Sequence, residues 1–285
     1  APLQSSGWSI NTSLEDYIVA ENGPTGEMFG YVYDGFYTTD DFTYNASGAR
    51  GSRYVLNNST TAPKQTSVNF GKIQPGTLKF KDLDGDSVIT LKDRTIIGHA
   101  QPKFTGGLNQ QFTFLKNFDL SVFVNWVVGN DIYNANKIEF TSSYSNGTNL
   151  ISEVNDRWRI ADNNGNDLRD TLPSVYAAFN QGAKMWIPST DASSYNLNSW
   201  AIEDGSFLRI NNVSLGYTFS SKSLRKAKIS KLRVYATVNN LAVITNYSGY
   251  DPEANTRNKS PLTPGIDYSA YPRSRSYLAG INLTF

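Results

Sequence analysis

Three aspartates alternate with other residues in the segment DLDGDSVITLKD, residues 82–93. Read as a twelve-position calcium loop, this segment offers oxygen ligands at positions 1, 3, 5, 7, 9 and 12. Calcium takes about six to eight oxygens, and clustered carboxylates repel one another unless a cation lies among them. The sequence therefore predicts calcium as a cofactor. The candidate ligands are Asp82, Asp84, Asp86, the Val88 carbonyl, Thr90 and Asp93.

Two departures leave a second interpretation of this segment open. Ser87 stands where such loops carry the turn glycine, and Asp93 is shorter than the usual bidentate glutamate. No helical pattern precedes the segment. An Asp/Gly-rich turn closed by side-chain to backbone hydrogen bonds would also explain the residues.

Aromatic residues in the long connecting segments are candidates for ligand binding. An aromatic face can cover the apolar side of a sugar ring. Packing within the loops, or an aromatic belt at a membrane interface, would explain the same residues. The candidates are Tyr144, Trp158, Trp186, Trp200, Tyr247 and Tyr250.

Catalytic chemistry finds little support in the composition. The chain has no cysteine, and its one histidine, His99, has no nucleophile motif beside it. The carboxylate pairs Glu203–Asp204 and Asp251–Glu253 carry no sign of a cleft between them. With 26 basic against 25 acidic residues and no basic block, a nucleic-acid partner is not expected either. We therefore do not expect an enzyme.

The elements that position these residues follow a period of two. Apolar residues recur at every second position from Phe104 to Phe114, and again from Phe118 to Val128, on either side of a three-residue turn. Such runs predict a β-hairpin, and about 9–11 residues suffice for a tilted strand to cross a bilayer. Barrel strands are only half apolar, so a mean hydropathy of −0.42 is compatible with them.

Further alternating runs extend the same pattern. We expect strands over 207–219, with a bulge near Asn211–Asn212, over 232–244 and over 275–285, and weaker strands at 27–37 and 77–80. Residues 115–117 and 220–231 form short connections, whereas 129–206 and 245–274 are long. Alternating short turns and long loops are typical of an outer-membrane barrel with long extracellular loops. Asn109, Gln111, Asn125, Thr237 and Asn239 would then face the lumen.

The order of several segments resembles the C-terminal third of SusC/RagA-type TonB-dependent outer-membrane transporters of Bacteroidetes. The segments are 75–134, beginning PGTLKFKDLDGD, then EDGSFLRINNVSLGYTF at 203–219, LRVYATVNNLAVITNYSGYDPE at 232–253 and GIDYSAYPRSRSYLAGINLTF at 265–285. GEMFGYVYDGFY at 26–37 also fits.

The resemblance implies an all-β fold: residues 1–285 would be the C-terminal segment of an antiparallel transmembrane barrel of about 22 strands. The plug and the N-terminal strands lie outside this sequence, so the chain would need the rest of the transporter. Segment 82–93 would be an acidic loop, and 129–206 a long extracellular region. The strand 275–285 would carry a barrel-assembly signal. Its residues are Tyr277, Ile281, Leu283 and Phe285.

The resemblance further implies import of oligosaccharides, with peptides as the second substrate class, across the bacterial outer membrane. The expected partners are the N-terminal part of the transporter, a SusD-like surface lipoprotein, membrane lipid, and TonB–ExbB–ExbD acting through the plug. A soluble extracellular β-rich glycan-binding or adhesion module with a calcium-stabilised loop remains the alternative.

Overall fold

The structure, a computed structural model, describes residues 3–5, 14–63, 70–143, 147, 149–191, 195–220, 224, 228–256 and 261–285. The chain divides into two compact units. Unit 1 comprises residues 1–100, 133–202 and 255–268, and unit 2 comprises 101–132, 203–254 and 269–285.

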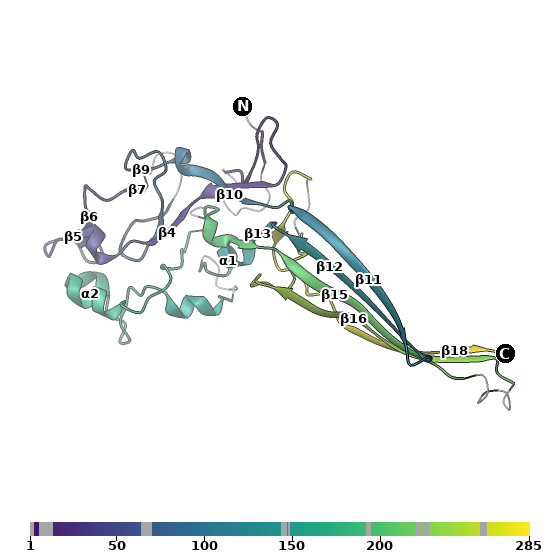
Figure 1. Ribbon diagram of the computed structural model, residues 1–285. Coiled ribbons are helices and arrows are strands. Elements are labelled where there is room, and N and C mark those ends of the chain that lie inside the picture. Colours follow the sequence, from purple (N-terminus) through teal and green to yellow (C-terminus); the bar gives the residue numbers. More distant parts are fainter. Residues whose placement is uncertain are drawn as a thin grey trace. The chain divides into compact units, whose positions relative to one another are not determined.

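Unit 2 is built on a five-stranded antiparallel sheet in the order β11-β12-β15-β16-β18, whose strands form the long curved arrows of Figure 1. The strands are β11 (Phe104–Phe114), β12 (Phe118–Val128), β15 (Phe207–Thr218), β16 (Lys231–Thr245) and β18 (Ser276–Thr284). Each described strand pairs with its neighbour along most of its length.

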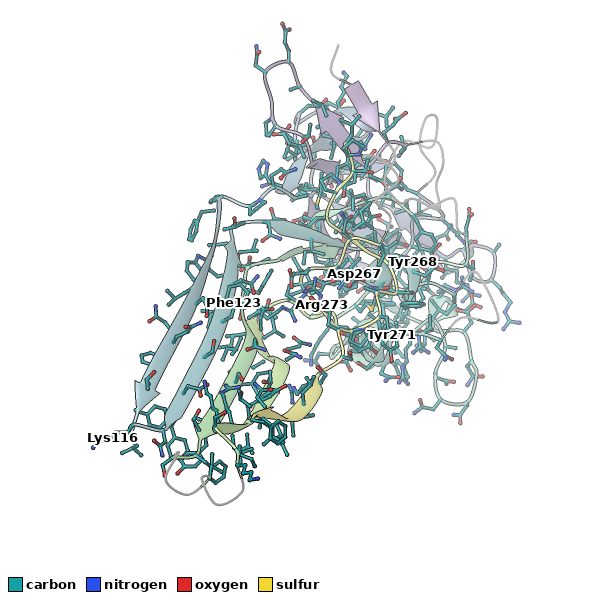
Figure 2. All side chains as sticks on the ribbon, turned by 90° about the vertical axis from the view of Figure 1, so that its right-hand side faces the viewer. Lys116, Phe123, Asp267, Tyr268, Tyr271 and Arg273 are labelled. Atoms are coloured by element: carbon teal, nitrogen blue, oxygen red, sulfur yellow. The ribbon has the colours of Figure 1, made fainter. Side chains whose placement is uncertain are left out.

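The hairpin of β11 and β12 has an unbroken register from Phe104↔Val128 to Phe114↔Phe118. Its turn bends tightly because Leu115 and Lys116 adopt positive φ angles of 48° and 64°. Figure 2 shows Lys116 at the tip of this turn. The Asn117 carbonyl accepts a hydrogen bond from the Thr218 N–H, which ties the turn to β15.

Because side chains alternate along each strand, this register sorts the residues of the sheet onto two faces. One face is apolar, and its side chains are largely exposed within the chain. It carries Phe104, Leu108, Phe112, Leu215 and Ile281, which are between 44 % and 65 % exposed.

The opposite face is polar and is connected by hydrogen bonds across the strands. They join Thr237 to Ser214, and Asn239 to both Asn212 and Ser276. An ion pair between Asp119 and Arg233 lies at the end of the sheet near the hairpin turn, over Gly216. A Cβ at Gly216 would lie 2.4 Å from the Arg233 guanidinium, so only glycine leaves room for this pair.

A bulge in β15 keeps the polar face continuous. The register shifts between Ile210 and Asn212 against β16, and the same stretch shifts against β12. One extra residue reverses the parity of a strand. Arg209 therefore lies on the same face as Ser214 and not beside Val213.

Unit 1 consists of short strands. The largest sheet has the order β1-β2-β3-β10, and smaller sheets pair β4 with β8, β5 with β6 and β7 with β9. The strands are β1 (Leu3–Ser5), β2 (Tyr17–Val19), β3 (Glu27–Tyr31), β4 (Tyr33–Phe36), β5 (Phe42–Tyr44), β6 (Tyr54–Leu56), β7 (Ala62–Pro63), β8 (Leu78–Phe80), β9 (Val88–Ile89), β10 (Arg94–His99) and β17 (Ile266–Asp267). Strands β13 (Asp131–Asn134) and β14 (Ile202–Asp204) cross the unit boundaries along the chain.

The helices of unit 1 are short. They are α1 (Ala135–Glu139), α2 (Pro173–Phe179) and the 3₁₀ turns η1 (Thr39–Asp41), η2 (Leu91–Asp93), η3 (Ser152–Asp156), η4 (Leu168–Asp170) and η6 (Ser199–Ala201). Separate apolar clusters hold these elements together, one around Tyr17 and Tyr133, another around Tyr31 and Phe80. Among the described residues, no helix has both the length and the apolar character to cross a membrane.

The structure confirms most of the expected strands. The hairpin has the expected bounds, the bulge lies beside Asn211, and the other long strands end within one or two residues of the expected positions. The weaker segment 27–37 divides into β3 and β4, and 77–80 shortens to β8. The long region 129–206 contains α1 and α2, which its irregular pattern did not indicate.

Neighbouring glycines of β11 provide a matched test of the sheet packing. An added Cβ at Gly106 would lie 2.4 Å from the Trp126 indole, whereas at Gly107 the nearest atom, in Phe123, is 3.4 Å away. We expect Gly106→Ala to lower the free energy of unfolding by about 1–3 kcal/mol, because the indole must move. Unfolding followed by tryptophan fluorescence measures this loss. Gly107→Ala is the control, and equal losses in both variants would contradict the packing described.

Candidate functional site

The acidic loop brings three of the predicted calcium ligands together. Each of Asp82, Asp84 and Asp86 has a carboxylate oxygen within 4.8 Å of the others. The same carboxylates accept backbone hydrogen bonds within the loop. Asp82 accepts from Gly85 and Ser87, Asp84 from Asp86, and Asp86 from Val88. Both interpretations of the sequence are thus represented, a turn with side-chain hydrogen bonds and a cluster of acidic oxygens.

Ser87 adopts a φ of 64°, the left-handed conformation that glycine usually provides at this loop position. The departure at position 6 therefore does not prevent the chain from turning. Val88 lies in β9, where it pairs with Ala62 of β7.

Asp93 stabilises the acidic loop through hydrogen bonds to its backbone. Its side chain is fully buried and accepts hydrogen bonds from the Leu83 N–H at 2.9 Å and the Thr90 N–H at 2.6 Å. Burial acts to raise the pKa of Asp93, but these backbone hydrogen bonds outweigh it and lower the pKa below its usual value. Asp93 thus stays ionised at neutral pH. Its two oxygens thus fix the backbone at Leu83 and at Thr90.

The aromatic candidates differ strongly in exposure. Trp158, Trp186 and Tyr247 are 4 %, 8 % and 5 % exposed, whereas Tyr250 is 78 % exposed. Trp200 is half-buried, and the Lys137 ammonium lies 4.2 Å from the centre of its ring. Tyr144 lies outside the described residues. Among the candidates that the structure describes, only Tyr250 has a largely exposed ring.

The three tryptophans line two adjoining cavities of unit 1. The first, of about 410 Å³, is lined by Trp186 and Trp200, whose rings pack edge to face at 4.7 Å. The second, of about 750 Å³, is lined by Trp158. The cavities share a wall formed by Ile160, Ile187, Pro188 and Thr190.

Backbone geometry fixes the wall between the cavities. Trp158 packs against Gly76, where an added Cβ would lie 2.4 Å from the indole, and Gly76 takes a φ of 91°. The Gly76 carbonyl accepts a hydrogen bond from the Ile187 N–H at 2.8 Å. The two cavities therefore share a wall whose backbone is held by this hydrogen bond, and together we call them the cleft of unit 1.

A buried ion-pair cluster in unit 2 was not indicated by the sequence. Arg209 is 2 % exposed and contacts Asp251 at 2.6 Å, Glu253 at 2.8 Å and the Asn240 amide oxygen at 2.7 Å. Arg273 contacts the same two carboxylates at 3.7 Å and 3.0 Å. Figure 2 shows Arg273 on the segment that leads into β18. The pair Asp251–Glu253 thus neutralises two arginines, and Arg209 itself gave no signal beyond its place in an alternating strand.

The other carboxylate pair is also structural in its contacts. Glu203 accepts hydrogen bonds from the Ser248 N–H at 2.9 Å and from its hydroxyl at 2.8 Å. Asp204 accepts one from the Ser206 N–H. These bonds tie Ser206 and Ser248 to the carboxylates of β14.

The residues of the expected assembly signal share one face of β18. Tyr277, Ile281, Leu283 and the final Phe285 are 71 %, 65 %, 49 % and 86 % exposed. Their spacing of two places them with the apolar face of the sheet, as expected for a strand that faces lipid.

Comparison with known proteins decides the family. The chain is 30 % identical over 272 residues to TonB-dependent receptor P3 of Formosa agariphila, a match that covers 94 % of this chain and 23 % of the receptor. TonB-dependent receptor SusC of Bacteroides thetaiotaomicron is 29 % identical over 209 residues, covering 72 % of this chain and 17 % of SusC. The chain is a C-terminal portion of a SusC/RagA-type TonB-dependent receptor.

Solved structures agree on the fold of this receptor portion. The RagAB peptide importer in the closed-closed state matches 98 % of this chain and 25 % of its own, with a TM-score of 0.59 at 18 % identity. A second RagAB structure gives a TM-score of 0.58 at 19 % identity. No family model matches the chain. The chain spans about a quarter of the length of receptor P3 and of another relative from Formosa agariphila, TonB-dependent receptor P39.

The calcium prediction has a direct test. We expect millimolar calcium to raise the melting temperature of the receptor, because the cation relieves repulsion among Asp82, Asp84 and Asp86. Asp84→Asn together with Asp86→Asn should abolish that rise. Asp156→Asn, at another exposed carboxylate of unit 1, is the control. A melting temperature that calcium leaves unchanged in the unsubstituted receptor would contradict the prediction.

The ion-pair cluster predicts unequal costs for two arginines of the same sheet. Arg209→Met should lower the free energy of unfolding by about 3 kcal/mol, because Asp251 and Glu253 lose their buried partner. Arg233→Met, which breaks the more exposed pair with Asp119, should cost no more than about 1 kcal/mol.

Thermal unfolding of the detergent-solubilised receptor compares the two variants. Adding Asp251→Leu to Arg209→Met should recover part of the stability, since an apolar pair leaves no buried charge unpaired at that position. If Arg209→Met proved no more costly than Arg233→Met, the buried cluster would not be the stabilising element described.

Proposed function

We propose that this chain forms part of the wall and the extracellular loops of a TonB-dependent outer-membrane importer for oligosaccharides, working with a SusD-like surface lipoprotein. Peptides are the second substrate class. The two-faced sheet of unit 2 is the observation that carries the proposal. Its exposed apolar face suits lipid, and its polar face suits a water-filled lumen.

The edges of the sheet support a larger barrel. Within the described residues of unit 2, β11 and β18 each pair with one neighbour in the sheet. An unpaired strand edge in lipid leaves backbone groups unsatisfied at several kcal/mol each. The remaining strands of the importer would pair with these edges, and the plug would fill the lumen.

The connections support an orientation. The hairpin turn at 115–117, the end of β15 and the start of β16 lie at one end of the sheet, and the long connections leave from the other. Short turns are periplasmic in outer-membrane barrels. The acidic loop precedes β11 in the chain, and the cleft is lined by residues that precede β11 and by residues of the long connection 129–206. In this orientation both segments join the extracellular ends of the strands.

In this arrangement the chain itself performs no catalysis. Asn125, Thr237 and Asn239 belong to the polar face that would border the passage. Tyr277, Ile281, Leu283 and Phe285 would serve the assembly machinery while the strand enters the membrane. Energy would come from TonB acting on the plug.

Oligosaccharides are favoured by the tryptophan-walled cleft of unit 1. Its two cavities have volumes of about 410 and 750 Å³, within the range of small-molecule sites. Trp200 is the half-buried tryptophan of the lining, and an aromatic ring suits the apolar face of a sugar.

Isolation of the native protein in mild detergent tests the proposal. We expect this chain to co-purify with plug-containing sequence and with a surface lipoprotein, identified by mass spectrometry. A chain that remains monodisperse without detergent and without these partners would instead be the soluble glycan-binding module.

A further inference from the structure

The cleft of unit 1 carries cations that no carboxylate of the described residues neutralises. Lys72 lines the first cavity, and Arg157 and Arg159 line the second. Lys72 donates to the Gly51 carbonyl and the Ser52 hydroxyl, Arg157 to the Val154 carbonyl, and Arg159 to the Asn163 amide oxygen. All of these acceptors are uncharged.

The acidic residues that line the cleft offset only part of this positive charge. Asp162 lines the second cavity, but it accepts hydrogen bonds from Asn164 and Asn166, which close its own turn. The Asn166 side chain and these backbone groups lower the pKa of Asp162, so this carboxylate is ionised and sets one negative charge against Arg157 and Arg159. Asp191 lines the first cavity.

A fourth cation of the cleft, Arg169, is oriented by the carboxylate of Asp167. Arg169 lines the first cavity and is held by Asp167 at 2.7 Å, while its Nη1 donates to Gln74 at 3.3 Å. Arg169 is thus neutralised, and it positions the Gln74 amide at the cavity wall. With Arg169 paired, Lys72, Arg157 and Arg159 stand against Asp162 and Asp191 in the lining, which leaves an excess of positive charge.

We propose that the cleft binds an anionic oligosaccharide, whose carboxylate or sulfate groups pair with Lys72, Arg157 and Arg159 while its rings contact the tryptophan walls. This inference rests on the proposed import function and names its substrate class. Guanidinium groups bind carboxylates and sulfates through paired hydrogen bonds, and the partial burial of Arg157 strengthens such a contact over one in open water. A neutral glycan would leave the three cations without anionic partners.

Comparing the native strain with a strain that lacks the transporter gene tests the inference while the glycan is still unidentified. Both strains grow on a mixed polysaccharide digest, and the oligosaccharides left in the medium are separated by anion exchange and identified by mass spectrometry. We expect the deletion strain to leave anionic oligosaccharides unconsumed. Their masses distinguish sulfate esters from uronic acids, and either result supports the proposal.

The other outcomes separate the two proposals. Neutral oligosaccharides left by the deletion strain would overturn the anionic substrate class, while oligosaccharide import would stand. Peptides left in the medium, or no difference between the strains, would overturn the import of oligosaccharides itself.

Substitutions then assign the binding to this cleft. Arg157→Gln with Arg159→Gln should reduce uptake of the identified oligosaccharide at low concentration by roughly tenfold, with an unchanged amount of receptor in the outer membrane. The control, Arg50→Gln with Lys184→Gln, removes two exposed cations of the same unit that lie outside both cavities. Lys72→Gln tests the first cavity separately and should reduce uptake about threefold. Uptake equal to that of the control would overturn the assignment.

Discussion

The cross-strand register of the five-stranded sheet is the constraint on which unit 2 depends. A shift of one residue between β11 and β12 would exchange the two faces of a strand, and would place Asn109 and Gln111 opposite Val122 and Leu120. The tight turn at Leu115 and Lys116 holds that register at one end. The bulge in β15 also shifts the register by one residue, and this shift places Arg209 on the polar face. Regular pairing and its single interruption together produce a sheet with two consistent faces.

Buried charged side chains stabilise segments that are not paired as β-strands. Arg209 and its carboxylates hold residues 251–253 against the sheet of unit 2, and Asp93 holds the backbone at Leu83 and Thr90 in unit 1. In each place the buried charge is satisfied by partners from an irregular segment. Removing such a charge would expose polar groups to an apolar surrounding, so these loops are fixed more firmly than their composition suggests.

The sequence predicted the long strands well because their signal is local. Alternation of apolar residues over eleven positions decides both the element and its faces, and the bulge is visible as a change of parity near Asn211. The short strands of unit 1 lack such runs. Helix α2 has only seven residues, too few for a helical period to stand out within an irregular region.

The candidate site was predictable by residue type but not by role. Trp158, Trp186 and Trp200 were identifiable as loop aromatics, yet the sequence could not show that they are walls of adjoining cavities instead of exposed stacking surfaces. Arg157 and Arg159 flank Trp158 in the sequence, but their importance depends on which carboxylates lie nearby in space. Asp167 and Asp170 pair with Arg169 and with Arg50 and Arg53, which leaves Arg157 and Arg159 with uncharged acceptors. Charge balance over the whole chain hides this local excess, because neutralisation is set by three-dimensional neighbours. The specificity of the cleft therefore follows from how the fold distributes a nearly equal number of charges.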